Sequence, residues 1–263
     1  MRFCRFEQGG ATGFGLVENL GGTEMITRTV SVLPRSFGDF EGATSAALPL
    51  ADVRILAPTQ PSKIVCIGRN YREHAKEFDS PVPQEPLIFL KPPSAVIAPG
   101  DSICRPHLLS DRIDHEGELG VVIGERCYRM RSGQDVRPYI LGYTCVNDVT
   151  ARDLQKRDGQ WSRAKGFDTF CPFGPVVAGG LDPWKGLQVE TRVNGDLRQC
   201  GTTSDFIFAL DVILHFVTRV MTLEPGDLIA TGTPAGVGPL QPGDTVEVTV
   251  EGVGTLRNPV VNL

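Results

Sequence analysis

Apolar residues occur along this chain in short stretches separated by glycine and proline, and this pattern predicts many short strands. The stretches 119–123 and 139–146 have the β-branched, apolar character of buried strands, whereas apolar and polar residues alternate over 245–250. Between residues 81 and 101 turn signals recur about every ten residues, a spacing typical of short strands rather than of a doubly wound sheet. The pattern therefore predicts a mainly β protein with a few helices, of the α+β class.

The first part of the chain differs from the rest because it carries no recognisable chemistry. Its strand-like pieces are short and are separated by glycine and serine; they are residues 2–6, 14–18 and 27–33. Pro58 and Pro61 then interrupt any regular element, since proline lacks a backbone N–H donor. We therefore predict a small N-terminal domain over residues 1–58 and a larger domain over residues 59–263.

Capping signals predict three helices in the larger domain. A small polar residue precedes each one, and in the first two an acidic residue follows at the spacing that lets both side chains bond to the helix start. The expected capping residues are Asn70 with Glu73, Thr150 with Asp153, and Ser204 or Asp205. In the third helix one apolar stripe is expected to face the core, made of Phe206, Leu210, Ile213, Leu214 and Val217.

Composition excludes several classes of function. The 263 residues carry a net charge of −5 and contain no cluster of Lys and Arg, which excludes a nucleic-acid-binding surface. No stretch reaches the roughly 18 apolar residues of a membrane span, and the N-terminus lacks the apolar core of a signal peptide. We therefore expect no membrane partner and a cytoplasmic location. The seven cysteines form no Cys-x-x-Cys pair, which indicates reduced thiols.

Three acidic residues are placed so that they could hold one metal ion. Glu116 and Glu118 are two apart in a strand, so both side chains point to the same face, about 6.7 Å apart along it. Beside apolar residues such a pair either takes up a proton or binds a cation. Asp148 follows the next strand, where the chain passes into a helix. Three hard oxygen ligands suit Mg²⁺, Mn²⁺ or Ca²⁺, although two acids spaced in this way more often form a solvated face.

Other polar residues could carry acid–base chemistry or bind a substrate. His74 and Glu77 share a helix face, where a carboxylate can orient the ring for general-base action on water; a surface ion pair is the alternative. Arg152 and Gln155 share a face of the second predicted helix. Lys165 lies in a segment rich in Gly, Phe and Pro, where it is either solvated or, if buried, able to polarise a carbonyl oxygen.

The glycine-rich stretch 232–238 is not a nucleotide-binding motif. It lacks the Gly-Lys-Ser/Thr ending of a phosphate-binding loop and does not match the dinucleotide fingerprint. Its backbone N–H groups and the Thr233 hydroxyl could instead approach an anionic substrate.

Five motifs together resemble the fumarylacetoacetate hydrolase superfamily over nearly all of the chain after residue 63. They are IGRNYREHAKEF, DHEGELGVVIG, GYTCVNDVTARDLQ, RAKGFDTFCPFGP and LEPGDLIATGTPAGVG. The resemblance implies a mixed β-roll with a small N-terminal domain, a homodimer, and a Mg²⁺ or Mn²⁺ site formed by Glu116, Glu118 and Asp148.

The same resemblance implies roles for other residues. It makes His74 and Glu77 a water-activating pair on a lid helix and makes Lys165 the cation that stabilises an enolate. Substrate contacts are implied for Arg69, Arg152, Gln155 and Thr233.

The reaction expected from this resemblance acts on a small 2-oxo acid through an enolate held at the metal. Because His74 and Glu77 favour water activation, we expect hydrolysis of the carbon–carbon bond of an acylpyruvate-type substrate. The alternative is an oxaloacetate tautomerase or decarboxylase, or a 2-hydroxyhepta-2,4-diene-1,7-dioate isomerase, since the stretches 167–175 and 231–238 also resemble such members. A metal-binding module without enzymatic activity is a third hypothesis, which Lys165 and His74 disfavour.

Overall fold

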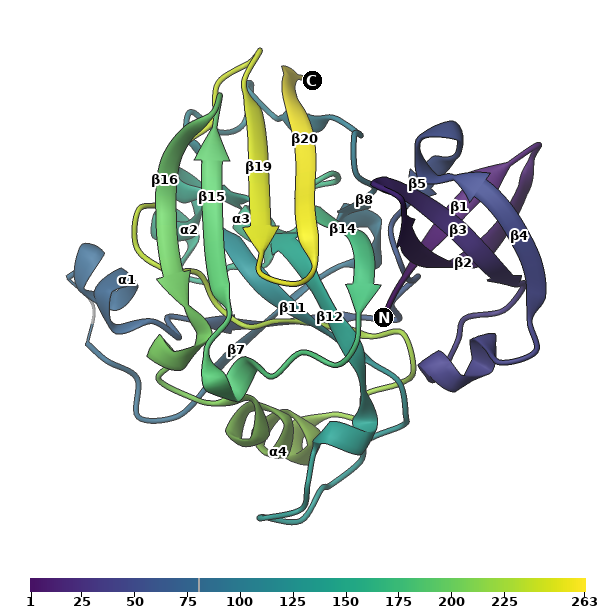
Figure 1. The fold of residues 1–263 in the computed structure, drawn as a ribbon. Coiled ribbons are helices and arrows are strands. Elements are labelled where there is room, and N and C mark those ends of the chain that lie inside the picture. The colour runs from purple at the N-terminus through teal and green to yellow at the C-terminus, as the bar shows by residue number, and fades with distance from the viewer. Residues whose placement is uncertain (80) are drawn as a thin grey trace.

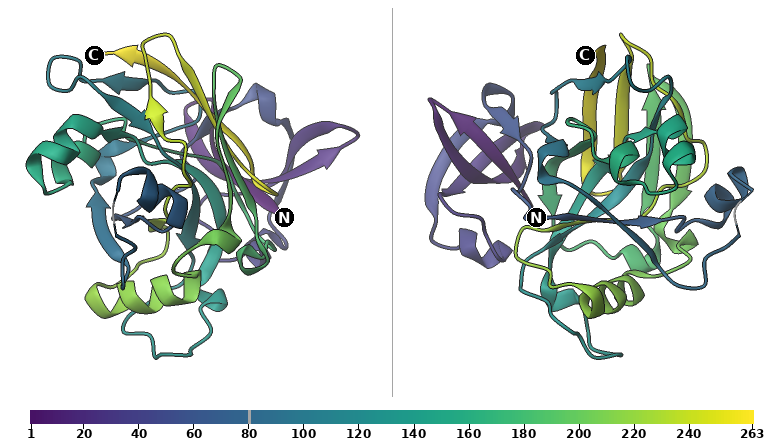
Figure 2. Two further views of the ribbon diagram at one scale, coloured as in Figure 1. Left: turned by 90° about the vertical axis from the view of Figure 1, so that its left-hand side faces the viewer. Right: turned by 180° about the vertical axis from the view of Figure 1, so that it is seen from behind.

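The chain folds mainly into strands. The computed structural model describes residues 1–79 and 81–263 (Figures 1 and 2). The predicted fold class, mainly β with a few helices, is confirmed. The helices are α1 (Arg72–Glu77), α2 (Arg152–Asp158), α3 (Ser162–Lys165) and α4 (Leu210–Val220), with short 3-10 helices at Phe37–Phe40, Leu50–Asp52, Pro93–Ala95, Arg137–Tyr139, Pro183–Lys185 and Thr203–Asp205. Within the described residues no helix has the length and apolar character that crossing a bilayer would require.

The largest sheet runs through both parts of the chain. Its strands are β1 (Arg2–Gln8), β2 (Ala11–Leu20), β3 (Thr23–Val30), β4 (Thr44–Pro49), β5 (Arg54–Leu56), β6 (Ile64–Gly68), β7 (Leu87–Lys91), β8 (Val96–Ile97), β11 (Gly117–Ile123), β12 (Ile140–Asn147), β14 (Cys171–Ala178) and β17 (Leu228–Ala230). The order is β4-β3-β2-β1-β14-β12-β11-β17-β6-β7, with β5 beside β1 and β8 beside β14. Strands β1 to β5 form the purple and dark blue group on the right of Figure 1 and extend the sheet from β14.

Two smaller sheets complete the β structure. One contains β10 (Ile113–His115), β13 (Thr150–Ala151) and β18 (Gly238–Pro239); the other contains β9 (Ile103–Arg105), β15 (Gln188–Val193), β16 (Asp196–Thr202), β19 (Thr245–Val250) and β20 (Gly254–Asn262). Strands β15 and β19 pack against β11. A Cβ atom on Gly117 would lie only 2.0 Å from Thr191 Oγ1 on β15, so glycine at this position allows the two sheets to approach closely.

The central strands are buried along their whole length, which explains their continuous apolar runs. Every residue of β6 and β11 is buried, and β11 lies between β12 and β17. Strand β17 pairs in parallel with β6, with Ile229 beside Val65. This pairing brings the loop after β17 close to α1, which follows β6, although more than 150 residues separate them in the sequence.

All three predicted helix caps are wrong. The N-cap residues are Tyr71, Ala151 and Ala209, and none of them makes a side-chain capping bond. Asn70 instead uses its amide to bind the carbonyls of Phe208 and Thr231.

The other two predicted caps fail for similar reasons. Thr150 donates to the carbonyl of Asp148, and Ser204 and Asp205 lie in a 3-10 helix before α4. Of the predicted stripe, Phe206 also precedes α4, whereas its buried members within that helix are Leu210, Ile213, Leu214 and Val217, as expected.

Candidate active site

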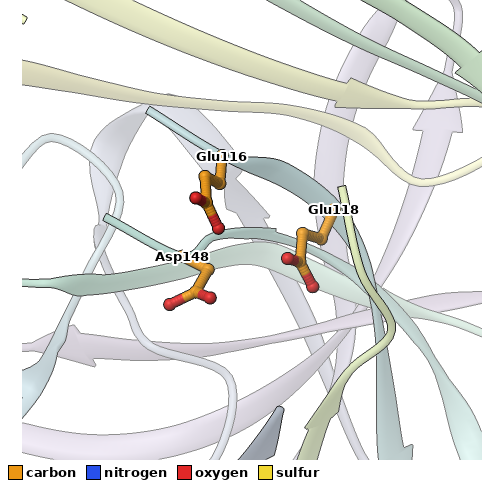
Figure 3. A group of neighbouring side chains, drawn as sticks. All are labelled: Glu116, Glu118 and Asp148. Carbon is orange, nitrogen blue, oxygen red and sulfur yellow. The ribbon is translucent and has the colours of Figure 1, made fainter. Parts of the chain in front are cut away.

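Three carboxylates meet at the end of the β11–β12 pair (Figure 3). Glu116 precedes β11, Glu118 lies on it, and Asp148 directly follows β12, so the pairing of Gly117 with Asn147 brings them together. One oxygen from each residue lies within 4.8 Å of the others. All three side chains are buried, so the alternative of a solvated acidic face is wrong.

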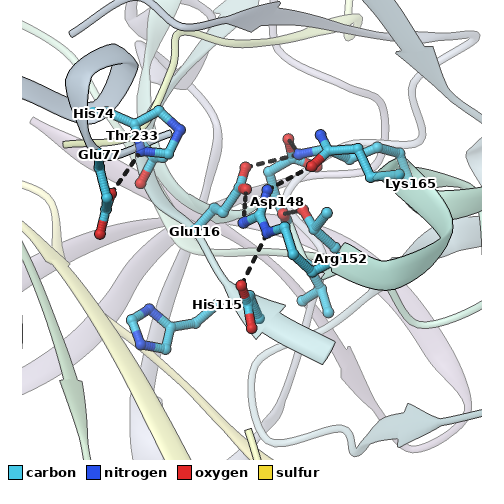
Figure 4. Close-up of polar contacts among 12 residues, drawn as sticks. His74, Glu77, His115, Glu116, Asp148, Arg152, Lys165 and Thr233 are labelled. Atoms are coloured by element: carbon cyan, nitrogen blue, oxygen red, sulfur yellow. Dashed lines mark hydrogen bonds and ion pairs between the residues drawn. The ribbon is translucent and has the colours of Figure 1, made fainter. Parts of the chain in front are cut away.

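Buried cations neutralise two of these carboxylates (Figure 4). Lys165 Nζ lies 2.7 Å from Glu116 Oε2 and 2.5 Å from Asp148 Oδ2. Lys91 Nζ lies 2.6 Å from Asp148 Oδ1, and Arg152 Nη2 binds Glu116 Oε1. Lys165 is therefore buried rather than solvated, the second of the two environments that the sequence left open.

The surrounding charges shift the pKa values of Glu116 and Glu118 in opposite directions. Burial raises the pKa of Glu116, but the charges of Lys165 and Arg152 outweigh burial and hold this pKa below its usual value. Burial, followed by the negative charges of Asp148 and Glu116, raises the pKa of Glu118 well above its usual value. Burial alone would lower the pKa of Lys165, but the two carboxylates beside it raise that pKa to about 12.

The residues of this cluster fit a divalent metal ion. Glu118 Oε2 accepts a hydrogen bond from Gly232 N at 2.7 Å, and within residues 1–79 and 81–263 no lysine or arginine forms an ion pair with Glu118. A carboxylate oxygen has two lone pairs, so the oxygens that accept from lysine can still bind a cation. Three buried hard oxygen donors, with one carboxylate lacking a cation, suit Mg²⁺ or Mn²⁺. Glu116, Glu118 and Asp148 would hold such an ion.

His74 and Glu77 form a pair on α1. His74 Nδ1 lies 3.1 Å from Glu77 Oε2, and Glu77 Oε1 accepts a hydrogen bond from Gly236 N at 3.2 Å. Only 7% of His74 is exposed, so the alternative of a surface histidine is wrong. Because the carboxylate holds Nδ1, Nε2 is the ring nitrogen that remains for a substrate.

Arg152 is held from several sides at once. Its Nε donates to Asp114 Oδ2 at 2.9 Å and its Nη1 donates to Gln155 Oε1 at 2.6 Å. The ring of Phe78 lies 4.8 Å from the guanidinium carbon. Burial alone would lower the pKa of Arg152, but the charges of Glu116 and Asp114 outweigh burial and raise this pKa above its usual value. The side chain is therefore a fixed positive charge.

Arg69 and Thr233 reach the same space from the ends of two neighbouring parallel strands, since Arg69 follows β6 and Thr233 follows β17. Arg69 has a left-handed backbone (φ 56°), and its guanidinium lies 5.9 Å from the ring centre of Trp161. Thr233 follows β17 and donates its hydroxyl hydrogen to the carbonyl of Gly117 at 2.8 Å.

One cavity of about 460 Å³ brings these residues together. Its lining includes every predicted site residue except Glu77, which lies behind His74. It also includes residues that the sequence analysis missed, among them Arg112, Lys156 and Trp161. Lys91 was missed as well; the only signal was a lone lysine at the end of an otherwise apolar strand.

Comparisons with known proteins identify the family of this chain. A family model described as fumarylacetoacetate (FAA) hydrolase C-terminal matches residues 63–261. The chain belongs to the fumarylacetoacetate hydrolase family. A second model, described as Rv2993c-like, N-terminal, matches residues 1–58. The resemblance that the motifs indicated is thereby confirmed, and the chain is an enzyme of the fumarylacetoacetate hydrolase superfamily.

Relatives within the fumarylacetoacetate hydrolase family include proteins with different names. Protein Rv2993c of Mycobacterium tuberculosis is 46% identical, covering 99% of this chain and 98% of that protein. Oxaloacetate tautomerase YisK of Bacillus subtilis is 45% identical, covering 81% of this chain and 76% of that protein.

Solved structures share both the fold and much of the sequence. That of 5-carboxymethyl-2-hydroxymuconate delta-isomerase from Mycobacterium smegmatis has a TM-score of 0.91 and 44% identity, covering 100% of both chains. That of 2-hydroxyhepta-2,4-diene-1,7-dioate isomerase from Mycobacterium marinum has a TM-score of 0.88 and 44% identity, covering 100% of this chain and 98% of that chain.

Proposed function

We propose that this enzyme interconverts the enol and keto forms of a small 2-oxo dicarboxylic acid such as oxaloacetate. The observation that carries the proposal is the cavity lining, in which a buried histidine and a surplus of cations surround the carboxylate cluster. The lining cations are Arg69, Arg112, Arg152, Lys156 and Lys165, and they outnumber the three carboxylates. A cavity of this charge attracts a dianion. The name of the Bacillus subtilis relative supports oxaloacetate as the substrate.

The residues of the chain can divide the proton transfer between them. Enol-to-keto conversion removes a proton from the enol oxygen and adds one to the neighbouring carbon. His74 Nε2 is suited to carry this proton, since Glu77 fixes the ring through Nδ1. Lys165 stays protonated, because its pKa is about 12, and stabilises the negative charge that develops on the oxygen. A divalent metal held by Glu116, Glu118 and Asp148 would add Lewis-acid polarisation of the 2-oxo group.

In this proposal the arginines and neighbouring polar groups orient the substrate. Arg152 is fixed by Asp114 and Gln155, so its guanidinium is already oriented for a carboxylate. Arg69 forms no ion pair with another described residue and can receive the second carboxylate. Gln155 and Thr233 line the same cavity and are proposed substrate contacts.

A second candidate is the isomerisation of a longer dienedioate. It is favoured by the size of the cavity, about 460 Å³, and by the names of the two structural relatives from Mycobacterium. The same groups would move a proton along a conjugated chain. Hydrolysis of an acylpyruvate, which the sequence favoured, stays a prediction and has less support than these two reactions, because the relatives described above whose names state an activity are one tautomerase and two isomerases.

The decisive experiment follows the ultraviolet absorbance of enol oxaloacetate and, in parallel, the release of pyruvate, in Mg²⁺ or Mn²⁺. We expect the enol form to disappear without stoichiometric pyruvate. His74→Gln should slow this conversion about 100-fold or more, since general acid–base groups contribute at least this much. His215→Gln is the matched control, because His215 lies on α4, outside the cavity, where its ring binds the carbonyl of Gln134. Pyruvate release that keeps pace with enol loss would instead identify a decarboxylase, and cleavage of an acylpyruvate would identify a hydrolase.

Three features of the whole protein belong to this proposal. The division into domains of residues 1–58 and 59–263 is supported by the two family models, which match residues 1–58 and 63–261. The homodimer and the cytoplasmic location remain predictions from the resemblance and from the sequence.

A further inference from the structure

The loop after β17 joins the two halves of the candidate site through its backbone. At its start, Gly232 N donates to Glu118 Oε2 at 2.7 Å. At its end, Gly236 N donates to Glu77 Oε1 at 3.2 Å. Residues 232–236 therefore contact the carboxylate without a cation at one end and the histidine–glutamate pair at the other.

Two glycines fix the path of this loop. Gly232 and Gly236 have φ values of 104° and 101°, which side chains rarely adopt. A Cβ atom on Gly232 would lie 2.7 Å from Asn70 Cβ, and one on Gly236 would lie 2.1 Å from the carbonyl oxygen of Arg198. The two ends of the loop are thus packed closely against Asn70, which precedes α1, and against β16.

The middle of the loop is anchored by Gln199 of β16, which is buried and lies outside the cavity lining. Gln199 Nε2 donates to Thr233 Oγ1 and to the carbonyl of Pro234, both at 2.7 Å. Gln199 Oε1 accepts from Gly117 N at 3.0 Å and lies 3.1 Å from His115 Nδ1. These four bonds use the whole hydrogen-bonding capacity of the amide, so it has one orientation.

This orientation determines which way the Thr233 hydroxyl points. Gln199 Nε2 donates to Thr233 Oγ1, so the single hydroxyl hydrogen goes to the Gly117 carbonyl. His115 Nδ1 must carry the hydrogen of its bond to Gln199 Oε1, because an amide oxygen only accepts. The Thr233 hydroxyl can therefore accept a hydrogen bond from a substrate, such as an enol O–H, but cannot donate one without leaving Gly117.

We propose that Gln199 is a positioning residue that holds the 232–236 loop. It thereby keeps Glu118 and the His74–Glu77 pair in a fixed position relative to each other. Its effect on catalysis rests on the proposed function. Its effect on the loop and on metal binding does not.

Gln199→Met tests this inference, because methionine has a similar shape and forms none of the four bonds. Asn258→Leu is the matched control: Asn258 is a buried amide on β20 that donates to the carbonyls of Ala98 and Asp101, both at 2.9 Å, outside the cavity. Amide hydrogen exchange in residues 231–237 and in α1 should speed up about 10-fold or more in Gln199→Met and not in Asn258→Leu. Mg²⁺ affinity, measured by calorimetry, should fall about 10-fold in Gln199→Met alone.

Steady-state kinetics test whether Gln199 also affects catalysis. Gln199→Met and Thr233→Val should each lower kcat/KM, and the double variant should lose less than the product of the two single losses, because the bond between Gln199 and Thr233 is broken in both single variants. If Gln199→Met does not fold, Gln199→Glu keeps the shape and the acceptor oxygen but removes both donors. Unchanged loop exchange and Mg²⁺ affinity in the Gln199 variants, or equal changes in Asn258→Leu, would overturn the inference. A wild-type protein that leaves enol oxaloacetate unchanged would overturn only the proposed function, since exchange and metal affinity are read without substrate.

Discussion

Glu116 and Glu118 are the same residue type, two positions apart and on one face of the chain. Their surroundings nevertheless shift their pKa values in opposite directions. On the side of Glu116, which we term the cationic side, Lys165 and Arg152 supply positive charge and lower its pKa. On the side of Glu118, which we term the loop side, the carboxylate accepts a hydrogen bond from Gly232 N, and burial together with the charges of Asp148 and Glu116 raises its pKa. Burial is common to both, so the partners decide the outcome rather than burial itself.

The difference indicates a division of labour within the cluster. The cationic side has fixed charges that stabilise a developing anion without reorganisation. The loop side has a carboxylate whose charge is favourable only when a cation arrives. We therefore propose that binding of a divalent metal is most sensitive to changes on the loop side, and that stabilisation of a developing anion is most sensitive to changes on the cationic side.

The largest effect is expected from removing the main charge of the cationic side with Lys165→Met. Enol conversion should fall about 1000-fold, and unfolding free energy in chelator should fall by about 3 to 5 kcal/mol, because breaking a buried pair leaves carboxylates without a partner. Urea unfolding and the ultraviolet assay measure the two effects. Lys185→Met, which removes an exposed ion pair with Asp182, should change stability by less than about 1 kcal/mol. A stable Lys165→Met variant would show that the two sides do not differ.

Metal removal should act through the loop side. Chelator should abolish the activity, and Mg²⁺ at about 100 times its dissociation constant should stabilise the wild-type protein by about 2.7 kcal/mol. Glu118→Gln should lose this stabilisation while keeping the hydrogen bond from Gly232, because the amide oxygen can still accept it. Thermal unfolding with and without Mg²⁺ measures the shift. A Glu118→Gln protein that Mg²⁺ stabilises as strongly as the wild type would remove Glu118 from the ligand set.

In chelator, the free energy of unfolding should depend on pH in opposite ways through Glu118 and Glu116, and each effect should be on the order of 1 kcal/mol. The pKa of Glu118 is raised in the folded state, so folded protein keeps a proton that the unfolded chain releases, and stability falls as pH rises above the usual carboxyl pKa of 4.5. Glu118→Gln should remove this fall between pH 5 and pH 8.

Glu116 should behave in the opposite way. Its pKa is lowered, so its stabilisation is present above pH 4.5 and is lost only as the pH falls through the lowered value. Glu116→Gln should therefore be less stable than wild type across pH 5 to pH 8. Urea titrations at several pH values test both variants, and parallel curves for the two would contradict the comparison.

The smallest effect is expected from Phe78→Leu. The Phe78 ring lies 4.8 Å from the Arg152 guanidinium carbon and helps to fix the cationic side. Loss of a partly exposed cation–π contact is expected to cost about 0.5 to 1 kcal/mol, which corresponds to a rise in KM of about two- to fivefold. Phe78→Tyr should restore the wild-type KM. A change in kcat without a change in KM would assign Phe78 to the proton transfer instead.

Much of the fold and of the carboxylate cluster could be predicted from local sequence, because strand periodicity places Glu116 and Glu118 on one face wherever the strand lies in the fold. The helix caps could not be predicted in this way. Asn70 has the right residue type for a cap, but its amide binds carbonyls more than 130 residues away, and such long-range partners leave no local signal.

The same reason explains which site residues escaped prediction. Lys91 ends a short strand and reads as an ordinary surface lysine until β7 is placed beside β6, where it reaches Asp148. Gln199 lies in a hairpin strand that looks exposed in sequence, and its role depends on the closeness of β16 to the loop after β17.

The pairing of β1 with β14 has a consequence for the first 58 residues. Arg2 and Phe3 lie beside Ala178 and Val177, and Phe3 is fully buried in the apolar cluster that also contains Phe173. A shortened chain without these residues would present an open strand edge next to an apolar hollow, which is a template for self-association. The amino-terminal strands thus cover this edge of β14 and move the open end of the sheet to β4.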